Sequence, residues 1–306
     1  MLSTVPIRAP KRLMQMASKA PRAVTLIVGA DHPVALESAY QATRVGLIEP
    51  VLIGNSTKLS ELAEAANWDI KPFQQIDATG DSALADAAAL AAADLAVKIV
   101  MKGQVHTDAL MGALLRKEAG IRIGKRLSHI FHMTLPDKDD PFLISDAALN
   151  VAPDMKTLQA IAENMVTLAD RIGIADPRLA VLSATEETLP QMPSSLIAAE
   201  LTEWARKAAL PAQIAGPLAF DNAVSPAAAE IKGLSNHPVA GRSQGVIVPS
   251  IEVGNALFKM MVYFMSACAA GVVMGGRIPI IVTSRADPPE ARLASAALAS
   301  LVVDKS

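Results

Sequence analysis

The stretch VTLIVGADHPVALESAYQATRVGLIEPVLI, residues 24–53, decides the fold class. It begins with an apolar, β-branched run, Val24–Val28, continues through a helical pattern over 32–46, and ends in a second apolar run, Pro50–Ile53. Neither run alternates with polar residues, which is typical of strands in a parallel sheet that is covered by helices on both faces. The stretch therefore predicts a strand–helix–strand unit of an α/β protein.

The same alternation continues along the chain. Five further apolar runs predict strands, at Ile99–Met101, Pro141–Ile144, Leu179–Leu182, Gly245–Val248 and Ile278–Val282. Helical patterns lie between them, over residues 57–66, 81–95, 107–117, 154–171, 194–208, 254–272 and 289–302. The polar, proline-containing segment TLPDKDDPF, residues 134–142, is either a domain junction or a hairpin turn.

Composition excludes several classes of protein. Apolar residues make up 51% of the 306 residues, which is enough for a large core, and the net charge of −2 offers no basic field for nucleic acid or anionic lipid. Cys268 is the one cysteine, so an internal disulfide and a cysteine-rich zinc site are excluded; it lies in an apolar helical pattern and is expected to be a buried thiol. Residues 1–20 have no secretory signal pattern, and no apolar run is long enough for a membrane span, so the cytoplasm is the expected compartment.

The stretch IIVTSRADPPEAR, residues 280–292, predicts an anion site. An apolar strand ends there on Ser284 and Arg285, immediately before a helical pattern. A hydroxyl and a guanidinium beside the N-terminus of a helix are suited to a phosphate or a carboxylate.

Two glycine-bearing turns and a basic cluster offer further candidates. The turn LIVGADHP, residues 26–33, and the turn that carries Lys102, His106 and Thr107 both lead from a strand into a helix. Each turn either binds an anion through its backbone N–H groups or is a plain connection. The cluster around Arg126, in GIRIGKRLSH, is either a solvated face or a phosphate site.

Three polar segments follow in the second half of the chain: SATEETLPQMPSS (183–195), GPLAFDNAVS (216–225) and PSIEVGNALFKMM (249–261). The first is a loop at a strand end, where α/β proteins build sites. The second and third contain helix starts, and their acidic and amide side chains are either helix caps or ligand contacts.

These segments in this order resemble the phosphate acetyl/butyryl transferase family. The resemblance covers about residues 20 to 302 and also includes KGQVHTDALM, GIRIGKRLSHIFHM and ISDAALNVAPDMKTL. The pieces SATEE and TSRAD resemble the butyryltransferase branch more closely. The resemblance implies two three-layer α/β domains with mainly parallel sheets and an active-site cleft between them, with residues 1–138 plus 274–306 in one domain and residues 139–273 inserted as the other.

The resemblance also implies the reaction acyl-CoA plus inorganic phosphate to acyl phosphate plus CoA, with CoA as a substrate, no metal or prosthetic group, and a dimer or higher oligomer. Arg285 and Arg126 would bind the phosphate, and Ser284 would stabilise an oxyanion. The family places an aspartate a few residues after the Ser–Arg pair as the base, and both Asp287 and Glu290 are candidates for it. The other polar residues of these motifs are expected to bind substrate: Lys102, His106, Thr107, Asp221, Asn222, Glu252, Asn255 and Lys259.

Two other functions remain open from the residues. An NAD(P)-dependent decarboxylating dehydrogenase of similar two-domain shape would need clustered aspartates for a divalent metal, and no such cluster is seen downstream. A catalytically silent homologue would bind CoA or phosphate without turnover. The length of the acyl chain, acetyl or butyryl, is not determined by these motifs.

Overall fold

The computed structural model describes residues 2–284 and 287–303 and divides the chain into two compact units. Residues 7–125 and 270–306 form the first, here the terminal unit, and residues 126–269 with residues 1–6 form the second, here the inserted unit. Each unit is an α/β structure with its own part of a mainly parallel sheet, so the predicted fold class is confirmed.

The strands of the terminal unit follow the order β3-β2-β1-β4-β11-β10. Neighbouring strands from β3 to β11 are parallel, and β10 pairs with β11 in the antiparallel sense. Their bounds are β1 Ala23–Val28, β2 Ile48–Gly54, β3 Gln75–Asp77, β4 Ile99–Lys102, β10 Cys268–Met274 and β11 Ile280–Ile281. The central strand β1 is almost entirely apolar and buried, because helices cover it from both sides.

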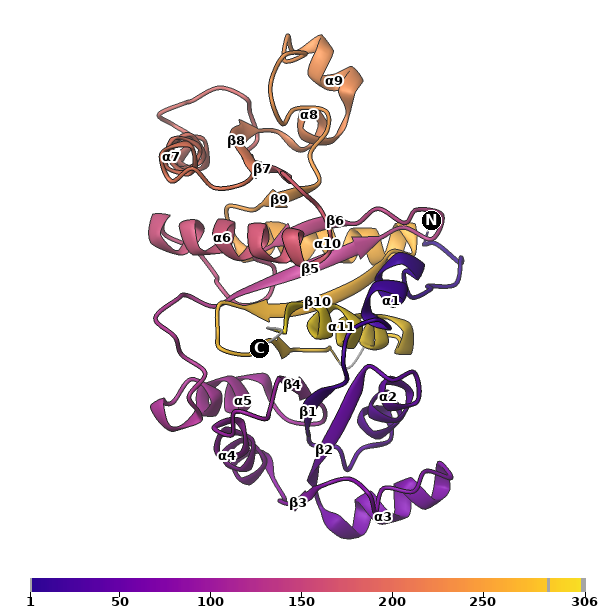
Figure 1. The fold of residues 1–306 in the computed structure, drawn as a ribbon. Coiled ribbons are helices and arrows are strands. Elements are labelled where there is room, and N and C mark those ends of the chain that lie inside the picture. Colours follow the sequence, from indigo (N-terminus) through magenta and orange to yellow (C-terminus); the bar gives the residue numbers. More distant parts are fainter. Residues whose placement is uncertain (1, 285–286, 304–306) are drawn as a thin grey trace. The chain divides into compact units, whose positions relative to one another are not determined.

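The helices of the terminal unit form two layers. On one face α4 packs against α5, and on the other α11 packs against α1 and α2, as Figure 1 shows on the two sides of β1 and β4. Small side chains allow this close packing: α4 buries Leu84, Ala85, Ala88, Ala89 and Ala92. The bounds are α1 Lys11–Ala17, α2 Pro33–Arg44, α3 Ser56–Ala65, α4 Asp81–Ala92, α5 Thr107–Leu114, the 3₁₀ turn η1 Lys117–Ala119, and α11 Pro289–Val302.

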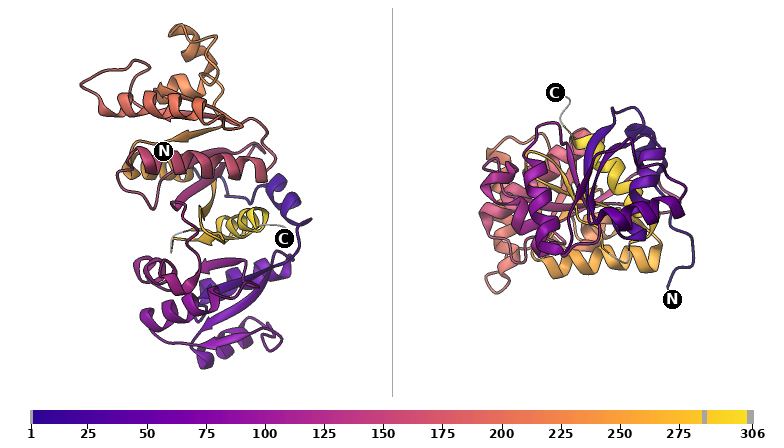
Figure 2. Two further views of the ribbon diagram at one scale, coloured as in Figure 1. Left: turned by 60° about the vertical axis from the view of Figure 1, so that its left-hand side comes forward. Right: turned by 90° about the horizontal axis from the view of Figure 1, so that it is seen from below.

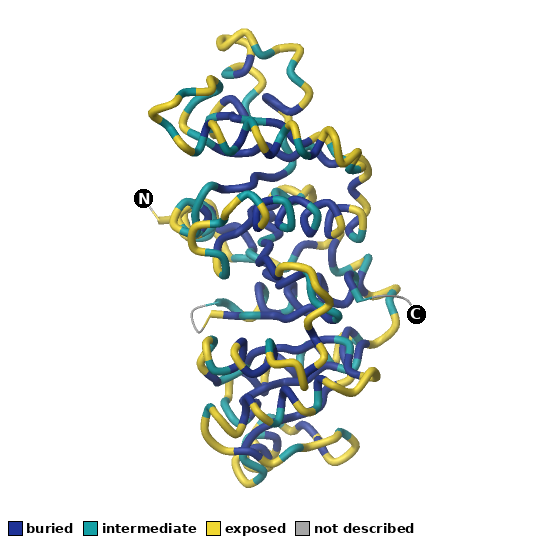
Figure 3. The backbone as a smooth tube through the Cα atoms, turned by 90° about the vertical axis from the view of Figure 1, so that its left-hand side faces the viewer, coloured by how far each residue is buried: buried dark blue, intermediate teal, exposed yellow. Residues whose placement is uncertain are grey.

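The inserted unit has the strand order β5-β6-β9-β7-β8, in which only the β5–β6 pair is antiparallel. Helices α6 and α7 pack together on one face, and α10 packs on β5 and β6 from the other, as the views in Figures 1 and 2 show. The bounds are β5 Ser128–Thr134, β6 Phe142–Ser145, α6 Met155–Arg171, β7 Arg178–Leu182, α7 Pro193–Lys207, β8 Gln213–Leu218, α8 Phe220–Val224, α9 Pro226–Ile231, β9 Gly245–Ile247 and α10 Ile251–Met265. The strands of each unit consist mostly of buried residues, and Figure 3 shows buried residues along the inner segments of the tube and exposed ones in the outer loops.

The segment over residues 134–142 is the connection of the β5–β6 hairpin, which was one of its two predicted roles. The predicted domain boundary at 138/139 would cut this hairpin, whose strands share one ladder from Ile130↔Ser145 to Met133↔Phe142. The compact units divide instead at 125/126 and at 269/270.

The prediction of one helix over 254–272 is wrong in its second half. Helix α10 ends at Met265, Ser266 adopts a left-handed conformation with φ of 51°, and Cys268 begins the buried strand β10. The thiol is buried as predicted, but on a strand. A continuous apolar run does not distinguish a buried helix from a buried strand, which explains the error.

Of the helices in the described part of the chain, none has both the length and the apolar character needed to cross a bilayer.

Candidate active site

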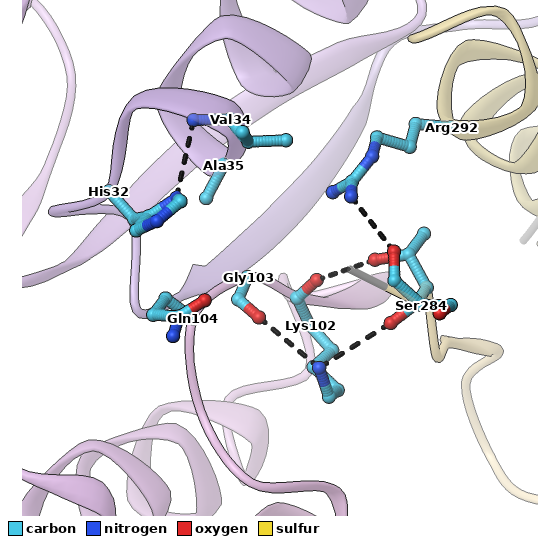
Figure 4. A pocket seen from close by; sticks show the side chains of 9 residues that line it. His32, Val34, Ala35, Lys102, Gly103, Gln104, Ser284 and Arg292 are labelled. Carbon is cyan, nitrogen blue, oxygen red and sulfur yellow. Dashed lines mark hydrogen bonds between the residues drawn. The ribbon is translucent and has the colours of Figure 1, made fainter. Parts of the chain in front are cut away.

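Hydrogen bonds join the ends of two neighbouring strands of the terminal unit, β4 and β11. Strand β4 ends at Lys102, and β11 lies parallel to it with Ile281 opposite Met101. Lys102 is only 6% exposed, and its ammonium donates to the carbonyls of Gly103 at 3.3 Å and Thr283 at 3.4 Å. The Thr283 hydroxyl donates back to the Lys102 carbonyl at 3.0 Å. A buried positive charge therefore lies where the two strands end (Figure 4).

A pocket of about 220 Å³ opens at these strand ends. Figure 4 shows the side chains that surround it: His32, Val34, Ala35, Lys102, Gly103, Gln104, Thr283, Ser284 and Arg292. Val34 and Ala35 supply an apolar side, and the cations Lys102 and Arg292 supply a polar one. The pocket therefore suits a small ligand that combines an anionic group with a short apolar chain.

The two glycine turns that the sequence singled out lie against each other beside this pocket. The amide of Gly103 donates to the carbonyl of Val28 at 2.8 Å, and the amide of Gln104 donates to that of Gly29 at 3.0 Å. Gly29 has a φ of 75°, and a Cβ atom built on it would lie 2.4 Å from the Gln104 carbonyl oxygen. A Cβ on Gly103 would lie 2.6 Å from the Gly29 carbonyl oxygen. Only glycine allows this approach at either position.

Ser284 and Asp287 are joined by two direct hydrogen bonds and by one arginine; the Asp287 amide donates to the Ser284 carbonyl at 3.2 Å. The Ser284 amide donates to a carboxylate oxygen of Asp287 at 2.7 Å. Arg292, in the first turns of α11 and 5% exposed, donates from Nη2 to the Ser284 carbonyl at 2.8 Å and from Nε to the Asp287 carbonyl at 3.0 Å. Arg285, the predicted phosphate ligand, lies outside the described residues.

The carboxyl group of Asp287 has an altered acidity. Burial raises its pKa, although the Ser284 amide and the positive charges of Arg292 and Lys102 act in the opposite direction. Burial also lowers the pKa of Arg292, an effect that Asp287 opposes. A carboxylate whose pKa is shifted upward is a better proton acceptor, so this geometry favours Asp287 as a general base.

The other predicted residues of the terminal unit lie away from the pocket lining. Glu290 is in the first turn of α11 and does not line the pocket. The side chain of His106 is 74% exposed, and its ring pairs with the carboxylate of Asp81. His106 is the residue before α5, and Thr107 is the first residue of that helix.

The remaining predicted residues belong to the inserted unit. Arg126 is exposed, and its carbonyl accepts a hydrogen bond from the Asn164 amide group at 3.2 Å. Asp221 is exposed on α8, whereas the neighbouring Asn222 is fully buried and donates to Glu186 at 3.2 Å. Glu186 also pairs with the Lys232 ammonium at 2.9 Å, which lowers the carboxyl pKa of Glu186.

Helix α10 carries the last three predicted residues. Glu252 and Lys259 are exposed, and the Lys259 ammonium lies 6.0 Å from the centre of the Phe258 ring. Asn255 donates to the Ala147 carbonyl at 3.4 Å. A hydrogen bond from Ser250 lowers the pKa of Glu252. None of the three lines the pocket of the terminal unit.

Sequence reasoning missed Arg292, His32, Thr283 and Gln104 as pocket residues. A signal for Arg292 was present: it is a charged residue in an alanine-rich helix that is buried on nearly all sides. Within residues 2–284 and 287–303, no three His, Cys, Asp or Glu side chains gather as metal ligands would.

Comparison with known proteins identifies the family. The family model described as "Phosphate acetyl/butaryl transferase" matches residues 82–300, more than half of the chain. The chain belongs to this family. The family resemblance predicted from the sequence is therefore confirmed, and with it the class of enzyme, an acyltransferase.

Relatives from both branches of the phosphate acetyl/butyryl transferase family match over nearly the whole chain. A phosphate acetyltransferase from Rhizobium meliloti is 38% identical over 291 residues, which cover 95% of this chain and 92% of the relative. A phosphate butyryltransferase from Clostridium acetobutylicum is 33% identical over 95% of this chain and 96% of its own. The crystal structure of a branched-chain phosphotransacylase from Enterococcus faecalis V583 superposes with a TM-score of 0.78 at 30% identity, covering 91% of this chain and 99% of that one.

Proposed function

We propose that this protein reversibly transfers a short acyl group between coenzyme A and inorganic phosphate. The family and its named relatives support the reaction class. The observation that carries the proposal is the pocket of the terminal unit, where the predicted Ser284 lies beside the buried cations Lys102 and Arg292 and next to the half-buried carboxyl group of Asp287.

In the direction of acyl-CoA synthesis, the CoA thiol attacks the carbonyl carbon of the acyl phosphate. Asp287 takes the thiol proton, a carbon–sulfur bond forms, and the carbon–oxygen bond to phosphate breaks so that inorganic phosphate leaves. The charge that develops on the carbonyl oxygen is stabilised by the Ser284 hydroxyl. The buried ammonium of Lys102 adds positive potential where the anion binds.

The phosphate itself needs a bidentate cation. Arg285 and Arg126 keep this role in the proposal because the family resemblance assigns it to them. The proposed base is Asp287 rather than Glu290, since Asp287 bonds to Ser284 and has a raised pKa.

The proposed chemistry uses CoA as a substrate and needs no metal or prosthetic group. We place the enzyme in the cytoplasm, with acyl-CoA and inorganic phosphate as its small-molecule partners and no nucleic-acid partner. A homodimer is part of the proposal because α10 exposes four large apolar side chains, Met260, Tyr263, Phe264 and Met265.

The test is a kinetic panel with acetyl-, propionyl- and butyryl-CoA, in which free thiol is measured with and without inorganic phosphate. Phosphate-dependent thiol release from one or more of these substrates is expected, and their kcat/KM values rank the acyl chains. The Ser284→Ala variant should have a kcat lower by about a hundredfold if its hydroxyl serves the oxyanion. A dehydrogenase or a silent homologue would release no thiol in response to phosphate, and that result would refute the proposal.

A further inference from the structure

We propose that Arg292 is a positioning residue, which holds Ser284 and Asp287 in register for the reaction by binding both of their carbonyl groups. The inference rests on the proposed function, because it concerns the same site. It goes beyond it by giving a role in catalysis to a residue of α11 to which neither the motifs described above nor the family resemblance assigns one.

Two hydrogen bonds join the Arg292 side chain to the segment before α11. Nε and Nη2 lie on one edge of the planar guanidinium group, and they donate to the carbonyls of Asp287 and Ser284 at 3.0 and 2.8 Å. A rigid fork that holds two acceptors fixes the distance between them. These two residues flank positions 285–286, so Arg292 binds both ends of the motif that the family resemblance assigns to the phosphate.

A cation at the position of Arg292 has an energetic cost. Arg292 is 5% exposed, and its burial lowers its pKa, so the charged form is held at an energetic cost. Its neighbours on α11 are mostly alanine and other small residues, which would pack without such a cost. A buried charge that is not needed for packing is therefore best explained by the site that it faces, and Arg292 does line the pocket.

Ser284, Asp287 and Arg292 are all hydrogen-bonded to one another. The Ser284 amide donates to the Asp287 carboxylate at 2.7 Å, while Arg292 binds the carbonyls of both residues. The first turn of α11 fixes the backbone of Arg292, because the Arg292 amide donates to the Pro288 carbonyl at 3.2 Å. The Asp287 amide also donates to the Ser284 carbonyl at 3.2 Å, so the guanidinium adds two hydrogen bonds to a turn that is itself hydrogen-bonded. The guanidinium charge also faces the Asp287 carboxyl, together with that of Lys102.

A matched control exists in the same unit. Arg277 also donates from Nε and Nη2 to two backbone carbonyls, those of Gly120 and Ala92, but it does not line the pocket. The Arg277→Met variant removes the same kind of structural bonds without touching the proposed chemistry.

The experiment compares wild type, Arg292→Met, Arg292→Lys and Arg277→Met by their melting temperatures and by kcat and KM for acyl-CoA and phosphate across pH. For Arg292→Met we expect kcat to fall about 30- to 100-fold with KM changed less than about threefold, because orientation is lost while binding is not. The acid limb of its kcat profile should move to higher pH, because the charge that opposes protonation of Asp287 is gone.

The Arg292→Lys variant keeps the charge but not the fork, so kcat should fall about tenfold while the acid limb stays in place. Arg277→Met should melt at a lower temperature and keep the wild-type kcat and pH profile.

Three results would overturn the inference. In the first, Arg292→Met behaves like Arg277→Met, with a lower melting temperature and wild-type kinetics. In the second, it raises KM for phosphate at unchanged kcat, which would make Arg292 a substrate ligand. In the third, Arg292→Lys has full activity, and this variant decides the matter if Arg292→Met does not fold. A wild type without phosphate-dependent thiol release would instead refute the proposed function.

Discussion

Asp287 in the terminal unit and Asp146 in the inserted unit are both carboxylates in segments that follow a strand, but their surroundings differ. Asp146 is 1% exposed, and its two oxygens accept four N–H groups: the amides of Ala148, Leu149 and His129, each at 2.9 Å, and the Asn150 side chain at 2.7 Å. Asp287 is only partly buried, and its carboxylate accepts one described amide, that of Ser284.

The difference shows two ways in which one charged residue organises a loop. At Asp146 the carboxylate is itself the organiser, and all of its capacity is used to gather donors. At Asp287, the Arg292 side chain binds the carbonyls of Ser284 and Asp287, so the carboxylate itself remains able to accept a proton. Burial raises the pKa of this carboxylate. The first arrangement uses the carboxylate fully within the fold, and the second leaves it able to accept a proton, as its proposed role as a base requires.

The largest expected effect comes from removing the carboxylate of Asp287. Asp287→Asn should lower kcat about a thousandfold, because the amide cannot accept the thiol proton. Glu290→Gln tests the other candidate and should retain the acid limb of the pH profile. Stopped-flow or steady-state thiol assays across pH distinguish the two. Loss of the acid limb in Glu290→Gln alone would make Glu290 the base.

The same Asp287→Asn variant should also be more stable at neutral pH. Burial makes the charged carboxylate less favourable in the folded protein than in the unfolded chain, so the wild type carries a penalty above the raised pKa. This penalty vanishes as the pH falls through that pKa. The melting temperatures of variant and wild type should therefore converge in acid, and a less stable variant at neutral pH would contradict the assignment.

The second largest effect is a loss of stability when the carboxylate of Asp146 is replaced. Asp146→Asn places an NH₂ group among buried N–H donors, so the free energy of unfolding should fall by about 2–4 kcal/mol in denaturant titrations. The control is Asp170→Asn, an exposed position in the same unit, which should change stability by less than about 0.5 kcal/mol. Equal stability of the two variants would show that the Asp146 network does not organise its loop.

The smallest effect is the pH dependence of stability that is caused by His129, a neighbour of Asp146. His129, whose amide donates to Asp146, is 1% exposed, and neither ring nitrogen has a hydrogen-bond partner; burial lowers the pKa of its imidazole to about 4, partly offset by the Asp146 charge. The folded pKa is depressed, so stability is full above pH 6.5 and is lost as the pH falls toward 4.

Between these pH values the wild type should lose roughly 2 kcal/mol more unfolding free energy than the His129→Leu variant. Denaturant titrations at several pH values provide the measurement. Parallel losses in the two proteins would mean that His129 is protonated as readily in the folded state as in the unfolded chain.

The sequence predicted most of the architecture. All seven predicted strands are present, because each is a buried apolar run between turn residues. Strand β3, Gln75–Asp77, was missed because it is short, polar and mostly exposed. Strands β5 and β8 were also missed, because polar residues interrupt the first and a glycine–proline pair lies in the second. Strand β10 was missed because its run of small apolar residues continues a helical pattern without a glycine or proline between them.

The candidate site was predicted less completely. Ser284 and Lys102 could be proposed because they stand beside predicted strand ends, where sites form in parallel sheets, and Asp287 because the family resemblance implies an aspartate after the Ser–Arg pair. Arg292 stood out as a charge in an alanine-rich helical pattern, but its role could not be proposed, because it depends on the turn of α11 that faces the carbonyls of Ser284 and Asp287. The pairing of His106 with Asp81 depends equally on contacts between residues 25 positions apart.

The contact between Gly29 and Gly103 has a consequence for protein engineering. Since neither position accepts a side chain, the wall that they form beside the pocket has a fixed shape. Attempts to change the acyl-chain preference of the proposed reaction should therefore vary Val34 and Gln104, whose side chains also line the pocket, and leave both glycines untouched.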